Sequence, residues 1–309
     1  MAWALFALIL LVGGVLYWAL FADSKASETA PDLFPVAEWR TLIDDADPTA
    51  LPTAISLLEV SKDVSPGFAA QAGRFGIYWP TTYSAFEIDT PDGAIIVDGG
   101  IDEDTFDLMV VTPSEAAFYE DAYRALIDKM AQARAIVLTH EHVDHVMAIS
   151  RHPDPEAIAP RLYLNAAQKP DLAQFARGGN LDPALISVEP RLPAAPQVIA
   201  PGVVVIPAPG HTDGSQVIFV RLQTGAEYLL IGDIVWTMSN LSDLTIRPVI
   251  TQFIIFDPNE DRAAIKNQVR ALHDLAAAEP DLILLPSHDR DYLMDLVAAG
   301  ELDLAGPAN

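Results

Sequence analysis

Three of the seven histidines in the chain lie within residues 140–145, which read HEHVDH. The apolar run 135–139 comes directly before them, as expected of a buried strand. A strand that delivers imidazoles and a carboxylate at its end brings ligands for first-row metals into one small volume. The alternative is a solvated, histidine-rich turn, but turns have no preference for imidazole side chains. The hexapeptide therefore predicts a metal site.

Three predicted strands in the second half of the chain end in a further candidate ligand. These are His211 after 203–206, Asp233 after 228–231 and His288 after 282–285. Binding groups concentrate in loops at one edge of a rigid sheet, because the sheet holds them while the loop exposes them. We therefore expect these three residues to join the hexapeptide.

The composition restricts both the partners and the metal chemistry. The 309 residues are 51% apolar, and 43 acidic against 18 basic side chains give a formal charge of −25. This chain is long and apolar enough for a large core, and its charge opposes a nucleic-acid partner, since phosphate binding uses clustered Lys and Arg. The chain has no cysteine, so a metal must be held by histidine and carboxylate, and zinc, iron and manganese are all permitted.

The first 22 residues contain an uncharged apolar run that starts at Ala2. As a helix of about 1.5 Å per residue it spans about 30 Å, the thickness of a bilayer core, and Trp3, Tyr17 and Trp18 are placed as interfacial aromatics. A cleaved signal peptide is the alternative, but no Lys or Arg precedes the run, which is longer than a usual signal core. We expect an uncleaved single-pass transmembrane helix over 1–22, with the following domain on the extracytoplasmic side, periplasmic in a bacterium.

The remainder divides into a linker and one domain. Residues 23–53 combine acids, small residues and prolines, which predicts a tether with one short helical turn. Residues 54–309 are expected to form the domain. Strands are predicted over 55–60, 76–79, 83–88, 94–97, 161–164, 203–206, 216–222, 228–231 and 282–285, and helices over 116–133, 166–176 and 260–278. Thr112 and Glu115 have capping-box spacing before the first of these helices. Strand groups that alternate with long helices predict an α/β fold with two halves packed sheet against sheet.

Together these motifs resemble those of the metallo-beta-lactamase superfamily. They are H-x-H-x-D-H at 140–145, G-H-T-x-G-S at 210–215, G-D at 232–233 and S-H-D at 287–289, with a strand ending in D-G-G at 98–100. The resemblance covers about residues 55–290 and implies an α/β fold of the four-layer αββα sandwich type.

The resemblance also implies roles for the motif residues. One metal ion would be held by His140, His142 and His211, a second by Asp144, His145 and His288, and both by the bridging Asp233. Asp98 would support the site from behind these ligands. The cofactors implied are two divalent ions, with zinc as the first choice.

The expected chemistry is hydrolysis of a small acyl substrate. Two ions about 3.5–4 Å apart lower the pKa of a bridging water and polarise a carbonyl oxygen at the same time. A hydroxide held between them would attack a lactone, ester or thioester carbon, so no Ser or Cys nucleophile is needed. Asp144 and Asp233 are the candidate catalytic carboxylates.

Several features narrow the resemblance. Zinc beta-lactamases with a cysteine ligand are disfavoured, because the chain has no cysteine. The short sequence after His288 does not contain the helical domain of glyoxalase II. Flavodiiron members usually have Glu at the position of His142. Lactonases and small ester or thioester hydrolases remain. Some lactonases have Tyr three residues after the bridging Asp, where this chain has Trp236. Two roles are equally possible for five apolar residues that follow: they line a pocket for an acyl chain, or they belong to the core. These residues are Trp236, Met238, Phe253, Ile254 and Phe256.

The two remaining histidines and the other polar residues of the motifs are not expected to bind metal. His152 and His273 are expected in surface or packing roles. Glu141 is expected to point away from the metals, with a structural and a catalytic role equally open. Thr212 and Ser215 are expected to orient the histidine of their motif.

A second class of function is a metal-binding sensor or interaction protein on the same fold, without hydrolysis. The complete ligand set favours the enzyme, because a scaffold without catalysis has no need of an open metal position. The sequence does not define the substrate, the metal or the oligomeric state.

Overall fold

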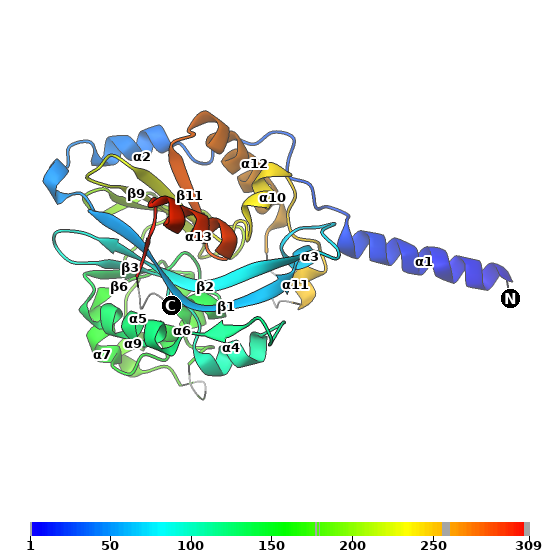
Figure 1. Ribbon diagram of the computed structural model, residues 1–309, viewed down its shortest axis with the longest axis horizontal. Helices are drawn as coiled ribbons and strands as arrows, with labels where there is room; N and C mark the ends of the chain where they lie inside the picture. The colour runs from blue at the N-terminus through cyan, green and yellow to red at the C-terminus, as the bar shows by residue number, and fades with distance from the viewer. Residues whose placement is uncertain (1, 177, 179, 255–259, 306–309) are drawn as a thin grey trace.

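The computed structural model describes residues 2–176, 178, 180–254 and 260–305, in which two β-sheets face each other (Figure 1). The first sheet has the order β12-β1-β2-β3-β5-β6, with β4 paired to β1, and the second has the order β11-β10-β9-β8-β7. The first sheet is built from β1 (Ala54–Pro66), β2 (Tyr78–Asp89), β3 (Ile95–Val97), β4 (Ala117–Phe118), β5 (Ala135–Val137), β6 (Leu162–Tyr163) and β12 (Asp303–Leu304). The second is built from β7 (Gln197–Ala200), β8 (Val203–Pro207), β9 (Gln216–Arg221), β10 (Glu227–Gly232) and β11 (Leu282–Pro286).

Helices cover the outer face of each sheet, apart from the first long helix, which projects from the body, and the last, which packs against the core between the sheets (Figure 1). The longer ones are α1 (Ala2–Leu20), α2 (Val36–Ile43), α4 (Glu103–Met109), α5 (Glu120–Gln132), α6 (Val143–Ser150), α12 (Arg262–Ala278) and α13 (Arg290–Ala299). The short ones are α3 (Gly67–Ala70), α7 (Pro155–Ile158), α8 (Gln168–Leu172), α9 (Pro183–Ile186), α10 (Met238–Ser242) and α11 (Thr251–Ile254).

Alternation of side chains along the strands explains the four layers. Val203 and Val205 point into the core between the sheets, whereas Val204 packs on the other face with α2 and α12. In the first sheet, Ile95 faces the same central core and Ile96 packs towards α5 and α6. Because side chains alternate between faces, a strand buried on both sides reads as a continuous apolar run. The expected αββα architecture is confirmed.

Helix α1 projects from the body of the molecule (Figure 1). The 18-residue span Trp3–Leu20 has a mean hydropathy of 2.2, and only 6% of it is buried within the molecule. It is long and apolar enough to cross a membrane, and a signal sequence shares both properties.

Residues 23–53 do not form the expected tether. Phe34, Trp39 and Ile43 are buried against the outer face of the second sheet, where the Trp39 ring lies 6.0 Å from that of Phe219. The backbone N–H of Ile246 also donates to the carbonyl of Ser24. Apolar residues at helical spacing in α2 explain the packing, because that helix buries one face.

The helix expected over 116–133 begins later, at Glu120. Thr112 and Glu115 do not cap it, because the preceding segment is fastened to β1: Asp63 accepts hydrogen bonds from the backbone N–H groups of Val111 and Thr112. Residues 117–118 then pair with β1 as β4. The strands expected over 76–79 and 83–88 are one strand, β2.

Candidate metal centre

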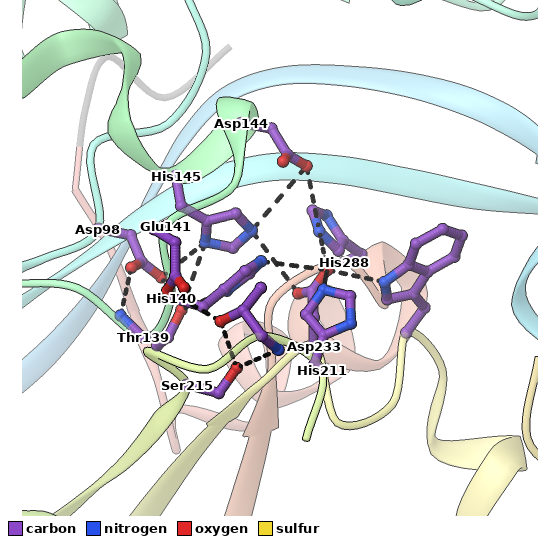
Figure 2. Close-up of polar contacts among 12 residues, drawn as sticks. Asp98, Thr139, His140, Glu141, Asp144, His145, His211, Ser215, Asp233 and His288 are labelled. Carbon is purple, nitrogen blue, oxygen red and sulfur yellow. Dashed lines mark hydrogen bonds and ion pairs between the residues drawn. The ribbon is translucent and has the colours of Figure 1, made fainter. Parts of the chain in front are cut away.

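The direction of the strands explains why the predicted ligands meet. β3 and β5 are parallel, as are β10 and β11, and β8 runs the same way as β10 because both are antiparallel to β9. Their carboxyl ends therefore point to one edge of the two sheets. His140 follows β5, His211 follows β8, Asp233 follows β10 and His288 follows β11. Figure 2 shows these side chains converging.

The structure brings all seven predicted ligands into three overlapping groups. Within each group the ligand atoms lie within 4.8 Å of one another: His140, His142 and His211; His140, His145 and Asp233; Asp144, His145 and His288. The first and third groups have the same members as the two sets that the resemblance implies.

The Asp233 carboxylate lies between these two sets (Figure 2). Its Oδ2 is 3.8 Å from Nε2 of His140 and 3.7 Å from Nε2 of His211. On the other side, Oδ2 is 3.1 Å from Nε2 of His288, and Oδ1 is 3.6 Å from Nε2 of His145. A carboxylate in this position can reach a metal in either set.

Several inward-facing atoms fit a divalent ion. Nε2 of His140, Nε2 of His145 and Oδ1 of Asp233 are buried and make no hydrogen bond to any of the described residues. Buried polar atoms normally have a partner, and imidazole with carboxylate is a donor set for zinc and related ions. Ligands about 2.0–2.2 Å from one ion lie more than about 3 Å apart, as do Nε2 of His145 and Oδ1 of Asp233, at 3.6 Å.

The sequence pattern of the metallo-beta-lactamase superfamily matches residues 78–288. The chain belongs to the metallo-beta-lactamase superfamily. With its groups of His and Asp ligands, it is a metal-dependent hydrolase of that superfamily.

Solved structures of the superfamily share this fold at low sequence identity. An N-acyl homoserine lactone hydrolase with N-hexanoyl-L-homoserine bound at its catalytic metal centre is 16% identical, with a TM-score of 0.57 over 79% of this chain and 96% of that chain. A probable metal-dependent hydrolase from Staphylococcus aureus is 15% identical, with a TM-score of 0.55 over 77% of this chain and 90% of that chain. No curated protein matches the sequence. At these identities the structural similarity establishes the fold alone.

Asp98 supports the metallo-beta-lactamase site from behind His145. Its Oδ2 lies 3.0 Å from Nδ1 of His145, and its carboxylate accepts hydrogen bonds from both N–H and Oγ1–H of Thr139. Asp98 has a φ of 67°, in the left-handed region. That conformation costs about 1–3 kcal/mol in a non-glycine residue, which the hydrogen bonds of Asp98 offset. The left-handed backbone conformation directs the Asp98 carboxylate at His145.

His211 is held by a residue that the sequence did not reveal. Its Nδ1 lies 3.2 Å from Oε2 of Glu260 and 2.7 Å from the guanidinium of Arg247, which also contacts that oxygen. Arg247 also donates to the backbone carbonyl of Asp233. A carboxylate on Nδ1 fixes the ring orientation of a metal-binding histidine and raises its basicity. On the other side of the site, Nδ1 of His288 lies 2.8 Å from the carbonyl of Thr82.

Burial and charge divide the histidines into two kinds. Burial lowers the pKa of His142 to about 4 and lowers those of His140 and His211 well below the usual range. These three therefore favour the neutral form that binds metal. Burial also acts on His145 to lower its pKa, but Asp98, Asp144 and Asp233 outweigh it and raise the pKa to about 10.

The Asp233 carboxylate is stabilised in its charged form. Burial acts to raise its pKa, but the neighbouring His288, His140 and His145 outweigh burial and lower the pKa well below its usual range. Asp233 therefore favours its negatively charged form at the centre of the site.

Glu141 has the structural role. Its Oε1 accepts a hydrogen bond from N–H of Gly214, and its Oε2 accepts one from Oγ1 of Thr212. Thr212 is also bonded to Ser215, so these hydroxyls shape the loop, whereas the imidazole of His211 is oriented by Glu260.

The five apolar residues considered for an acyl pocket lie in different surroundings. Trp236 lies at the site and donates from Nε1 to Asp233 Oδ2 over 2.7 Å. Met238 packs with the core under the second sheet, and Phe253 is exposed. Phe256 and the side chain of Ile254 lie outside the described residues.

The two remaining histidines take the packing roles expected of them. His152 is buried, with Nδ1 at 2.9 Å from the carbonyl of Asp154. His273 is partly buried, and its Nδ1 lies 3.0 Å from the carbonyl of Leu241. Neither belongs to a group of metal ligands among the described residues.

Proposed function

We propose that the protein is a membrane-anchored hydrolase with two divalent metal ions that cleaves a lactone, ester or thioester. The observation that carries this proposal is the position of the Asp233 carboxylate, 3.1–3.8 Å from ligand atoms of both histidine sets. One ion is assigned to His140, His142 and His211 and the other to Asp144, His145 and His288, with Asp233 shared. Zinc is the first choice, and iron and manganese suit the same donors.

The metal ions and the protein side chains have different roles in the proposed hydrolysis. When bound, two ions supply a water of lowered pKa and Lewis acidity towards a carbonyl oxygen. The side chain of Asp144 keeps 13% of its surface exposed, against 5% for His288, and its Oδ2 lies 3.3 Å from Nε2 of His288. It therefore stands at the open side, where it can orient a water and accept its proton. The water adds to the acyl carbon, the bond to the leaving oxygen or sulfur breaks, and the leaving atom takes up a proton.

An acyl substrate is supported by the neighbours and by the site. The similar fold of N-acyl homoserine lactone hydrolases supports the class of a carboxylic ester or lactone, although the identity is only 16%. The Trp236 ring stacks on that of Trp79 with centroids 6.5 Å apart, and it lies 6.0 Å from the ring of His288. A pair of aromatic rings beside the metal ligands gives an acyl chain an apolar surface.

The test is metal analysis of the purified full-length chain together with a substrate panel. We expect about two metal ions per chain and turnover of lactones, esters or thioesters, but not of phosphodiesters or β-lactams. Asp233→Ala should abolish turnover and leave the circular dichroism spectrum unchanged; retained turnover would remove Asp233 from its assigned role. Metal binding without hydrolysis of any probe would instead favour the sensor or interaction protein.

We propose further that α1 is an uncleaved anchor, with the catalytic domain over 54–309 on the extracytoplasmic side. The exposure of α1 supports an environment other than water for its apolar side chains. Mass analysis of the mature protein should show residues 1–22 retained. A compartment reporter fused to the C-terminus should be active outside the cytoplasm, and a cytoplasmic signal would overturn the orientation.

A further inference from the structure

The loop between β1 and β2 carries exposed apolar side chains beside the end of α1. Phe75, Ile77 and Tyr78 expose 45–63% of their surface, and Phe253 on α11 exposes 65%. Figure 1 places α3, in this loop, and α11 next to the carboxyl end of α1. We call residues 67–78 with Phe253 the hairpin surface.

Direct contacts tie the hairpin surface to α1. The Phe21 ring lies 5.5 Å from that of Phe75, which in turn stacks on Phe68 at 5.7 Å. The backbone N–H of Ile250, just before α11, donates to the carbonyl of Ala19 over 2.9 Å. If α1 crosses a bilayer, its last turn lies at the interface, and these contacts place the hairpin surface at the same depth.

The composition of this surface suits lipid rather than electrostatic attachment. The chain carries a formal charge of −25, which anionic lipid headgroups repel. Arg74, the basic residue of the loop, pairs with Asp243 over 3.0 Å. Aromatic and aliphatic side chains of this kind sit at the membrane–water interface and bury apolar area there without any basic patch.

The hairpin surface is also connected to the metal centre. Trp79 directly follows the hairpin surface along β2, and its ring stacks on that of Trp236. Trp236 in turn donates to the Asp233 carboxylate. The Trp79–Trp236 pair therefore lies between the end of the hairpin surface and the metal ligands.

We propose that the hairpin surface rests on the bilayer crossed by α1, so that the metal centre receives acyl substrates dissolved in the membrane. This inference rests on the membrane anchor of the proposed function. It adds a bilayer contact of the catalytic domain itself and a lipid-like substrate with a long acyl chain. An aromatic surface that touches lipid beside the site lets such a chain enter without crossing water.

The chain contains no cysteine, which permits a direct test with single labels. Full-length Leu11→Cys, Ile77→Cys and Ile186→Cys proteins, each labelled with an environment-sensitive fluorophore, are placed in phosphatidylcholine nanodiscs with or without nitroxide-bearing lipids. Ile186, on α9, is an exposed apolar control away from the hairpin surface, and Leu11 reports on α1. We expect the labels at positions 11 and 77 to be quenched several-fold more than the label at 186.

The outcomes separate the two proposals. Quenching at position 11 but not at 77 would overturn the bilayer contact and leave the anchor intact. Quenching at none of the three positions would show that α1 does not cross the membrane, and the contact would fall with it.

Kinetics in nanodiscs test the substrate class. Ile77→Ser should lower the ratio of kcat/KM for a long-chain acyl ester to that for a short-chain ester, several-fold relative to wild type. Ile186→Ser serves as the matched control and should leave this ratio unchanged. An equal ratio in Ile77→Ser and wild type would overturn delivery of substrate from the bilayer.

Discussion

The indole Nε1–H of Trp236 donates a 2.7 Å hydrogen bond to Oδ2 of Asp233, the oxygen that also lies 3.1 Å from Nε2 of His288. The donor fixes one oxygen of the carboxylate that is assigned to both metal ions. A hydrogen bond to a charged group contributes about 1.5–3 kcal/mol, and each 1.36 kcal/mol in a barrier is a factor of about ten in rate. Trp236→Phe keeps a ring and removes the donor, so we expect kcat to fall about 10-fold to 100-fold.

Trp79→Phe is the matched control for that measurement. Its indole Nε1 is buried and has no hydrogen-bond partner among the described residues, so removing the donor costs no interaction. We expect a kcat close to wild type on a short-chain ester. Equal losses in the two variants would show that ring stacking, rather than the bond to Asp233, accounts for the effect.

Glu260 should control metal affinity through His211. Glu260→Gln keeps an oxygen that can accept from Nδ1 but removes the charge that makes His211 more basic. Loss of such a carboxylate typically lowers metal affinity about 10-fold to 100-fold. Titration against a competing chelator measures the affinity, and circular dichroism confirms the fold. Glu279→Gln, at an exposed carboxylate paired with Arg40, should bind metal like wild type, and equal affinities in the two variants would contradict the role of Glu260.

The contrast between Glu260 and the seven ligands shows what the sequence reveals about a site. Each ligand directly follows a recognisable strand or belongs to the hexapeptide, so local pattern and spacing predicted it. Glu260 and Arg247 lie in irregular segments around α11 and reach His211 only through the folding of that part of the chain. Their sequence neighbourhood carries no periodicity that points to the site. Trp236 was noticeable by position, but only the structure shows its donor facing Asp233.

The packing of residues 23–53 on the second sheet was not predicted, for a different reason. The acids and prolines of this segment are typical of a linker, and they outweighed Val36, Trp39 and Ile43, whose spacing of three and four residues marks one face of a helix. The apolar face predicted the structure of this segment better than its composition did. Burial of apolar area stabilises a helix in the folded protein even where the neighbouring residues are typical of a linker. The sheets were predicted well, since strands buried on both faces are continuous apolar runs.

Gly214 and Glu141 should show strong energetic coupling. A Cβ at position 214 would overlap Oε2 of Glu141, so Gly214→Ala must displace the carboxylate or the loop that carries His211. Overpacking of this kind costs about 1–3 kcal/mol. Glu141→Ala alone loses the hydrogen bonds from Gly214 and Thr212 but removes the overlap with the carboxylate, so that the new methyl group is crowded by Cγ of Gln168 and no longer by Glu141. In chemical unfolding, we therefore expect the double variant to lose less stability than the sum of the single variants; additive losses would show that the loop relaxes without Glu141.

Asp102 should make stability depend on pH at the junction of α4 and α6. Its Oδ2 accepts a 2.6 Å hydrogen bond from Arg151, and its Oδ1 caps α4 through N–H of Thr105. Burial acts to raise the pKa of Asp102, but the hydrogen bonds from Thr105 and Arg151 outweigh it and lower the pKa below the usual 3.8. The charge therefore contributes stability that is fully present above pH 3.8 and is lost as the pH falls through the lower pKa of the folded state.

Asp102→Asn isolates this contribution, because Asn still caps a helix but carries no charge. We expect the free energy of unfolding at pH 7 to fall by about 1–3 kcal/mol, and the difference from wild type to shrink as the pH is lowered below about 3.8. Asp107→Asn changes an exposed carboxylate on the same helix and should stay within about 0.5 kcal/mol of wild type. Urea unfolding of the three proteins in detergent from pH 7 to pH 3 measures both effects. A difference between Asp102→Asn and wild type that is constant across this range would show that packing, rather than the ion pair with Arg151, accounts for the loss.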